Sequence, residues 1–172
     1  MIEQYVDMLK KSEDDYIRRE ELLHFIKDEF ADNPIVLVPY VDYFATFLDS
    51  SRNLTRLITF YILRFIASID PTKIHPYLEY FQKGMNDKNI SVQDNSSFVL
   101  GYLGGQTNLD ILISHSKTMV PNHAVAHADR FLQASNGYGF SELMEVLDQR
   151  QGEFSKNSLN RLNRIKVKFS QR

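Results

Sequence analysis

The chain lacks cysteine and tryptophan, and it has only seven glycines and five prolines among 172 residues. Without cysteine there can be no disulfide, thiol nucleophile or cysteine metal ligand, a composition that fits a reducing compartment. No run of about 18 apolar residues occurs, so we expect no membrane-spanning helix. The first fifteen residues lack the apolar core of a signal peptide. We therefore expect a soluble, cytoplasmic protein.

The chain also lacks a large net charge of either sign, but its charged residues are distributed unevenly. The formal net charge is −2, which argues against a global attraction to nucleic acid or to an anionic membrane. Residues 150–172 hold seven basic residues and one acidic residue, a local charge of +6. The other 149 residues hold 13 basic and 21 acidic residues, a charge of −8. An acidic body therefore carries a basic C-terminal segment.

Two neighbouring segments, 39–67 and 76–105, share one pattern of apolar and turn residues. With one extra residue in the second turn, the matching pairs are Pro39 and Pro76, Tyr40 and Tyr77, Tyr43 and Tyr80, Phe44 and Phe81, Leu54 and Val92, Phe60 and Phe98, and Phe65 and Leu103. Each segment reads as two helices around a polar turn. A repeat of about 38 residues made of two helices indicates an α-solenoid.

The pattern extends in both directions to give four to five helix pairs. We expect pairs at about residues 2–30, 35–69, 74–105, 107–135 and 140–170, forming a single all-α domain, a right-handed α-α superhelix. The helix over 54–69 is apolar almost all round, which predicts a central position. In the first pair, Ser12 is predicted to cap the second helix. That helix is expected to bury Tyr16, Leu22, Leu23, Phe25, Ile26 and Phe30.

The stretch Asn86–Gly104 resembles the HEAT-repeat family, which is close to the armadillo-type repeats. The matching features are Asp87 in the turn between helices, then Val92, Ser96-Ser97, Leu100-Gly101 and Leu103-Gly104. Gln93 stands where the family usually has the arginine of its Asp–Arg ladder. The resemblance implies an α-α superhelix whose second helices line a concave, usually ligand-binding, face. It implies no specific activity and no cofactor.

Aligning the predicted second helices places polar residues in two columns. Arg18, Arg56, Asp94 and His127 form one column, and Glu21, Thr59, Ser97 and Arg130 form the next. We interpret the columns as a mixed-charge groove, although Arg56 and Asp94 could instead pair with each other. The predicted partner-binding residues are Arg18, Arg56, Thr59, Asp94, Ser97, His127 and Arg130. The predicted function is non-catalytic binding of a partner protein or peptide on the concave face, as an adaptor, an inhibitor or an immunity-type protein.

The basic C-terminal segment supports an alternative function. Arg161, Arg164 and Lys168 lie at i, i+3 and i+7 on the polar side of an amphipathic helix, which suits either a solvated cap or a nucleic-acid contact. Phosphate backbones call for clustered arginine and lysine, which the mixed-charge columns do not offer. Nucleic acid is therefore an alternative partner, and no membrane contact is expected.

An enzymatic function is the least favoured of the hypotheses. His115, His123 and His127 are close in sequence, and the last two share a helix face at a spacing that zinc can use. No cysteine is nearby, and Asp110 is the third ligand that this hypothesis would need. HEAT-like metal hydroxylases rely on His-Glu dipeptides, and none of the five histidines precedes glutamate. HEAT-like DNA glycosylases use tryptophans and a basic concave face, both missing here. We predict no catalytic, metal or cofactor residues.

Overall fold

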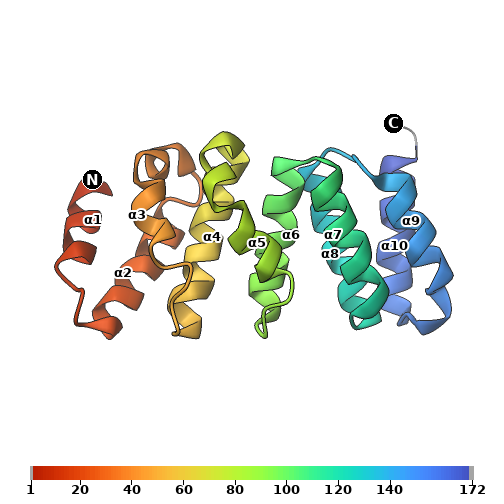
Figure 1. Cartoon of the computed structure of the whole chain (residues 1–172), viewed down its shortest axis with the longest axis horizontal. Helices are drawn as coiled ribbons and strands as arrows, with labels where there is room; N and C mark the ends of the chain where they lie inside the picture. Colours follow the sequence, from red (N-terminus) through yellow and green to blue (C-terminus); the bar gives the residue numbers. More distant parts are fainter. Residues whose placement is uncertain (1, 171–172) are drawn as a thin grey trace. The chain divides into compact units, whose positions relative to one another are not determined.

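The computed structural model describes residues 2–170, and in this part of the chain it contains only helices (Figure 1). The prediction of an all-α fold is confirmed. The regular secondary structure of the described residues consists of ten α-helices and four short 3₁₀ segments, with no strand. The α-helices are α1 (Ile2–Lys10), α2 (Tyr16–Glu29), α3 (Val41–Ala45), α4 (Asn53–Ile69), α5 (Leu78–Gly84), α6 (Ile90–Leu103), α7 (Gln106–Thr118), α8 (Pro121–Ala134), α9 (Phe140–Gln149) and α10 (Lys156–Phe169). The 3₁₀ segments are η1 (Pro34–Tyr40), η2 (Pro71–Lys73), η3 (His75–Tyr77) and η4 (Gln151–Glu153). None of the described helices combines the length and the apolarity that crossing a bilayer requires.

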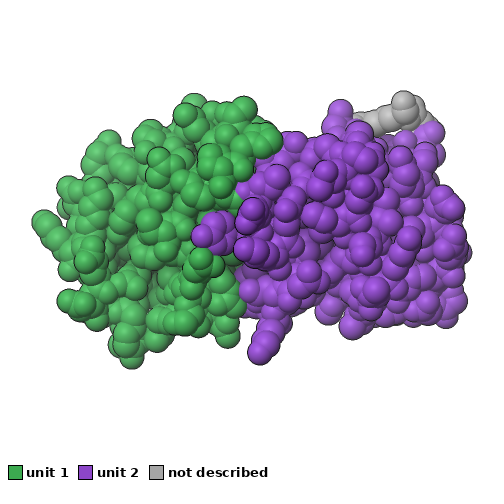
Figure 2. Space-filling view, in the orientation of Figure 1, with its two compact units in different colours: residues 1–77 green, residues 78–172 purple. Residues whose placement is uncertain are grey.

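The chain divides into two compact units, residues 1–77 and residues 78–172 (Figure 2). In unit 1, α2 packs against α1 and α4, and α3 packs against α4. In unit 2, α6 packs against α8, α8 against α10, and α7 against both α8 and α9. The second helix of each predicted pair therefore contacts the second helix of the next pair within each unit. The single domain over 1–172 stays a prediction.

The core of unit 1 forms around α4, whose Ile58, Ile62, Leu63 and Ile66 are buried. The prediction for α2 was wrong in part, because Tyr16 and Phe25 are 46% and 42% exposed. The Phe25 ring lies 4.6 Å from the Tyr5 ring, and the Arg52 guanidinium lies 3.8 Å above the Tyr16 ring. Each aromatic ring covers a neighbour at the edge of the packed layer, which leaves its outer side in water.

The start of α2 also differs from the prediction. Asp15, and not Ser12, is the N-cap: its carboxylate accepts a hydrogen bond from the backbone N–H of Arg18 at 3.0 Å. Ser12 is buried, and its hydroxyl donates to the carbonyl of Leu9 at 2.8 Å, which closes the end of α1. Serine and aspartate are both good caps, so the pattern alone does not select between them.

The turn before α6 shows how Gln93 acts in place of the expected arginine. Asn89 is the N-cap of α6 and accepts a hydrogen bond from the N–H of Ser91 at 2.9 Å. The carboxylate of Asp87 accepts one from the N–H of Asn89 at 2.8 Å. The Gln93 side-chain amide donates to the carbonyl of Asp87 at 2.6 Å. Gln93 therefore ties the first turn of α6 back to the segment that precedes it.

Helices α6 and α8 approach each other closely at Gly101. A Cβ atom at this position would lie 2.6 Å from the carbonyl oxygen of Phe131 and 2.7 Å from the Cβ of Ala134. Real Cβ atoms do not approach backbone oxygen so closely, so only glycine permits this crossing. The contact holds the last turn of α6 directly against the last turn of α8.

Gly101→Ala tests this close approach. Alanine favours helix formation by about 1 kcal/mol over glycine, but overpacking against backbone costs about 1–3 kcal/mol or more, so we expect a net loss of stability. Chemical denaturation monitored by circular dichroism measures the change in the free energy of unfolding. The matched control is Gly152→Ala, whose added Cβ would meet open space. An unchanged or raised stability for Gly101→Ala would contradict the observed packing.

Candidate binding site between α8 and α10

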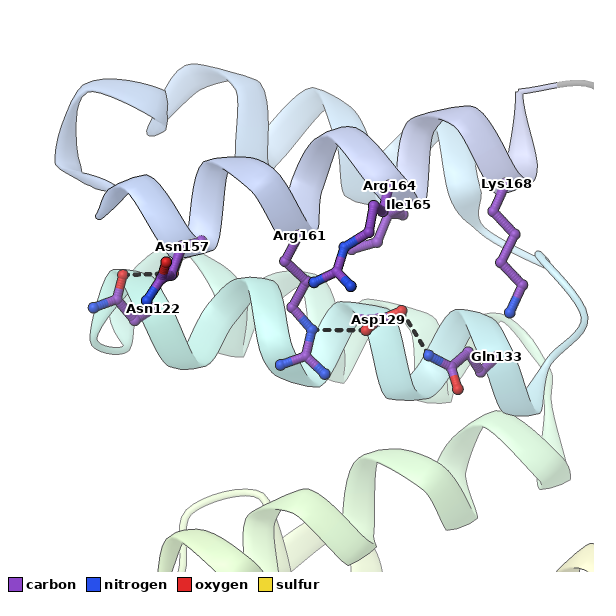
Figure 3. Close-up of a pocket in the computed structure, with 9 residues that line it drawn as sticks. Asn122, Asp129, Gln133, Asn157, Arg161, Arg164, Ile165 and Lys168 are labelled. Carbon is purple, nitrogen blue, oxygen red and sulfur yellow. Dashed lines mark hydrogen bonds and ion pairs between the residues drawn. The ribbon is translucent and has the colours of Figure 1, made fainter.

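A cleft of about 410 Å³ lies between α8 and α10 within unit 2 (Figure 3). Its walls are mainly polar or charged, and one apolar side chain, Ile165, lies among them. Asn122, Asp129 and Gln133 line the α8 side, while Asn157, Ser158, Arg161, Arg164 and Lys168 line the α10 side. Figure 3 shows Arg161, Arg164 and Lys168 directed from α10 toward α8. The alternative basic patch predicted from the sequence is therefore one wall of this cleft.

Helical periodicity explains why these side chains line up. Residues 157, 161, 164 and 168 recur at i, i+4, i+7 and i+11, which places them in one stripe along α10. On α8, residues 122, 129 and 133 follow the same spacing, and Ala126 occupies the remaining position of the stripe. Alanine there leaves room between the two polar rows.

The first turns of the two helices are joined by hydrogen bonds. The side-chain oxygen of Asn122 accepts from the Ser158 hydroxyl at 2.6 Å and from the Ser155 backbone N–H at 3.3 Å. The Ser155 hydroxyl caps α10 by accepting from the N–H of Ser158 at 3.3 Å. These bonds set the register of α10 against α8 at one end of the cleft.

One arginine of the cleft is held in place by an acid, and two further cations are not. The Arg161 Nε lies 2.7 Å from Oδ2 of Asp129, and the Gln133 amide donates to Oδ1 of Asp129 at 2.8 Å. Both carboxylate oxygens are thus engaged. Arg164 has no ion pair among residues 2–170, and Lys168 has a cation–π contact with Phe169 at 5.1 Å but no acidic partner there. The cleft therefore carries uncompensated positive charge.

Two further basic residues of the C-terminal segment are paired with acids. Arg150 pairs with Glu153 at 2.6 Å and donates to the carbonyl of Ser116 at 2.6 Å. Lys166 pairs with Asp148 of α9 at 2.6 Å. Arg172 lies outside the described residues. Within residues 150–170, Lys156, Arg164 and Lys168 have no ion pair, and the cleft contains two of these three cations.

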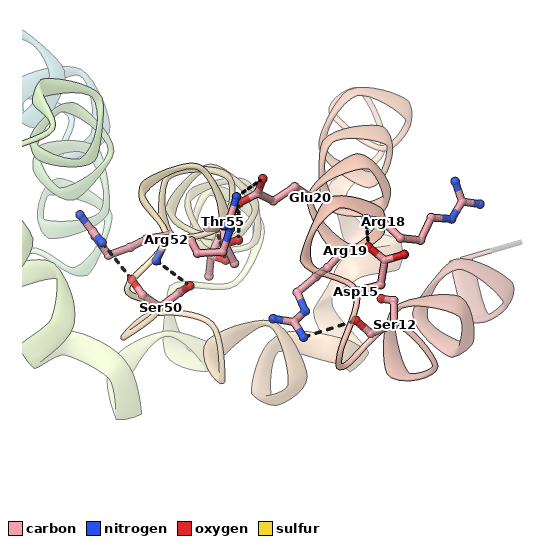
Figure 4. Close-up of polar contacts among 10 residues, drawn as sticks. Ser12, Asp15, Arg18, Arg19, Glu20, Ser50, Arg52 and Thr55 are labelled. Carbon is pink, nitrogen blue, oxygen red and sulfur yellow. Dashed lines mark hydrogen bonds and ion pairs between the residues drawn. The ribbon is translucent and has the colours of Figure 1, made fainter.

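In unit 1, the predicted partner-binding residues make contacts of their own. Arg18 is exposed and pairs with Glu21 at 3.1 Å, and Figure 4 shows its guanidinium directed away from α4. Arg56 donates to the carbonyl of Ser50 and to the side chain of Asn53, both at 2.9 Å. Thr59 is fully buried and donates to the carbonyl of Thr55 at 2.8 Å.

An ion pair between α2 and α4 was not anticipated from the sequence. Arg52 binds Glu20 through two hydrogen bonds of 2.8 and 3.2 Å, and the Thr55 hydroxyl donates to Glu20 at 2.9 Å (Figure 4). The hydrogen bonds from Arg52 lower the pKa of Glu20 despite its burial. The partners lie 32 and 35 positions apart, so no local spacing signals the contact. It fastens the two second helices of unit 1 to each other.

In unit 2, the predicted columns do meet, but as an internal link between α6 and α8. Asp94 lies 2.9 Å from Nε2 of His127 and 2.8 Å from a guanidinium nitrogen of Arg130. The His127 contact has the distance of a hydrogen bond but not its geometry. Ser97 is fully buried and donates to the carbonyl of Asp94 at 2.8 Å.

These observations correct the predicted site at three positions. Thr59, Ser97 and His127 are fully buried, so their side chains do not form part of an exposed groove. The reason is that the second helices pack directly on one another, which places the aligned positions between helices. Asp94 and Arg130 stay partly exposed, and each already has its charged partner.

The three histidines cluster, with His115 and His127 buried and His123 half-buried. The rings of His115 and His127 stack with centroids 5.4 Å apart, and His123 lies 6.3 Å from His127. Burial, with a smaller effect of His127, lowers the pKa of His115 to about 4. Burial also lowers the pKa of His127, although Asp94 opposes the shift. No group of three or more potential metal ligands converges within residues 2–170.

The histidine cluster makes stability depend on pH. Because the folded-state pKa of His115 lies below its ordinary value of 6.5, the unfolded chain takes up a proton first as the pH falls. Stability is therefore full above pH 6.5 and declines toward about pH 4, with a contribution from His115 on the order of 3 kcal/mol. We expect His115→Gln to show a shallower decline in the free energy of unfolding over this range.

Urea denaturation at a series of pH values measures this difference, because carboxylate titration is common to both proteins. The control His75→Gln changes an exposed residue of unit 1 and should follow the wild-type profile. Parallel pH profiles for wild type and His115→Gln would show that the buried imidazole does not titrate as described.

Comparison with known proteins identifies no relative of this chain. No protein-family model, no curated protein and no solved structure matches the chain. The cleft between α8 and α10 is thus the feature from which a function has to be argued.

Proposed function

We propose that this chain is a non-catalytic protein-binding module that binds an acidic segment of a partner protein in the cleft between α8 and α10. The observation that carries the proposal is the pair of cations, Arg164 and Lys168, that face α8 without an acidic partner among the described residues. A carboxylate from a partner would complete their interactions. Charge-assisted hydrogen bonds of this kind are stronger than neutral ones.

The cleft is prepared for binding by contacts that do not involve a ligand. Arg161 is already oriented by Asp129, which in turn is held by Gln133. With its Nε on Asp129, the Arg161 guanidinium keeps further N–H groups that can reach a ligand. Side-chain amides of Asn122 and Asn157 add neutral hydrogen-bonding groups. Arg161 therefore needs little further ordering on binding, which favours affinity.

We further propose that the helix pairs stack as a HEAT-like α-α superhelix. The packing of α2 on α4 in unit 1, and of α6 on α8 and α8 on α10 in unit 2, supports this arrangement. So does the resemblance of Asn86–Gly104 to the HEAT repeat. In such a superhelix the cleft would lie in the layer of second helices, which is the usual ligand-binding side of that family.

The polar groups of unit 2 favour binding over catalysis. Asp94, His127 and Arg130 are engaged with one another, and the His127 ring is fully buried. Within the cleft, the carboxylate of Asp129 positions Arg161 and accepts from Gln133. The groups that face the opening are cations and amides, which bind anions by charge and hydrogen bonding.

Nucleic acid is the second candidate ligand, because Arg161, Arg164 and Lys168 form a straight row. One observation places it behind an acidic protein segment. Two uncompensated cations neutralise about two phosphates, a salt-dependence slope of roughly −2, which is far below that of dedicated nucleic-acid binders.

The double variant Arg164→Glu with Lys168→Glu tests the proposal. We expect partner affinity to fall at least about tenfold, because reversed charges repel the acidic segment. Stability should change by less than about 0.5 kcal/mol, since both side chains are exposed. The measurement is affinity capture from a lysate of the source cells with and without nuclease, read by mass spectrometry, and then calorimetry with the purified partner.

The matched control is Lys73→Glu with Lys117→Glu, which makes the same change in net charge at exposed positions outside the cleft. This variant should retain the partner. A partner that binds wild type and the cleft variant equally would exclude the cleft. Recovery of nucleic acid alone, lost on nuclease treatment, would favour the second candidate.

A further inference from the structure

Arg164 and Lys168 border a second depression on the other side of α10. This hollow, about 290 Å³, is lined by Asn163, Arg164, Val167 and Lys168. Val167 is 71% exposed, the largest value among the exposed large apolar residues of the described chain. The two cations therefore form a ridge, with the polar cleft on one side and an apolar hollow on the other.

The position of Val167 has no role in the packing of α10. The helix buries Leu162, Ile165 and Phe169 on its inner face, and Val167 lies on the opposite side. Valine is also a weaker helix former than the residues usually found at exposed positions. The aliphatic stems of Arg164 and Lys168 extend the apolar surface around it. A single exposed apolar residue is common, but one flanked by two uncompensated cations can contact an amphipathic ligand.

We propose that the acidic segment bound at the cleft is amphipathic: its carboxylates bind Arg164 and Lys168, and a large apolar side chain covers Val167. This inference rests on the proposed function and adds the chemistry of the ligand. The charge complementarity selects acidic residues, and the hollow selects an aliphatic or aromatic neighbour. Burial of Val167 and its ligand would add hydrophobic affinity to the charge contacts.

The spacing of the ridge sets a spacing in the ligand. Arg164 and Lys168 are separated by four residues, a rise of about 6 Å along the helix. In an extended chain, residues i and i+2 point to the same side and lie about 6.8 Å apart. An extended segment with acids at i and i+2 therefore matches the two cations, and we place the apolar residue within two positions of this pair.

The test is selection of a displayed library of random twelve-residue peptides on the full wild-type chain. Peptides that also bind the variant Arg164→Glu with Lys168→Glu are removed. We expect the retained peptides to share two acidic residues at i and i+2 with a large apolar residue within two positions. The best peptide is then synthesised with a fluorescent label, and its affinity is measured by anisotropy.

Two substitutions isolate the apolar contact. Val167→Ser should weaken the labelled peptide by roughly fivefold, the loss expected from one partly buried valine. Replacing the apolar residue of the peptide with serine should weaken wild-type binding equally and should not weaken Val167→Ser further. Ile35→Ser, at a 60% exposed position in unit 1, is the control and should bind as wild type does.

The outcomes separate this inference from the proposed function. Acidic peptides without an apolar preference, or unchanged binding to Val167→Ser, would overturn the inference and leave the acidic-segment proposal standing. Selected peptides without acidic residues, or none retained, would overturn both. Stronger competition by twelve-nucleotide single-stranded DNA than by the best peptide would replace the protein ligand with nucleic acid. Self-association in sedimentation that is lost in Arg164→Glu with Lys168→Glu would make a second copy the occupant and overturn the inference.

Discussion

The contact of α6 with α8 is the constraint on which the geometry of unit 2 depends. At Gly101 the backbone of α6 lies directly against the backbone of Phe131 and the Cβ of Ala134 in α8. A few turns away, Asp94 links the same helices through His127 and Arg130. The steric contact at Gly101 and the charged contacts at Asp94 together leave α8 little freedom to rotate or slide against α6. Because α8 forms one wall of the cleft, this packing also determines where Asp129 and Gln133 point.

The second wall is attached to the first by polar contacts of a different kind. Asn122 joins the starts of α8 and α10, and Asp129 binds Arg161 further along. The carboxylate of Asp129 is thereby paired with Arg161, so Arg164 and Lys168 can bind an anion. A basic stripe on an isolated helix would be an ordinary solvated face. It becomes a candidate site because a neighbouring helix supplies an opposite wall with only one carboxylate.

Burial divides the charged and polar residues of this chain into two groups with different consequences. Residues between the second helices, such as His127 and Ser97, are buried and affect stability. Residues at the edges of the same helices, such as Arg164, contribute to binding. The lowered pKa of His115 belongs to the first group, because burial penalises its charged form. The shift at His115 thus reflects the packed interior around the ring.

The sequence by itself determined the helical elements. Apolar periodicity and Pro121 placed α8, and the apolar run over 54–69 placed α4, because both signals act within a few turns. Local patterns also found Arg161, Arg164 and Lys168 as one row, since residues at i, i+3 and i+7 share a helix face whatever surrounds them. The choice between Ser12 and Asp15 as the cap of α2 was less certain, because both residues suit that role.

Only the tertiary structure decided which aligned residues face water. The columns from Arg18 to His127 aligned by sequence offset, but the offset carries no information on how closely helices pack, and three of the predicted residues proved to be buried. The pairings of Glu20 with Arg52 and of Asp129 with Arg161 join residues 32 positions apart. Such contacts depend on the approach of separate helices. Which cations stay uncompensated, and hence where a ligand can bind, follows from that approach and not from local spacing.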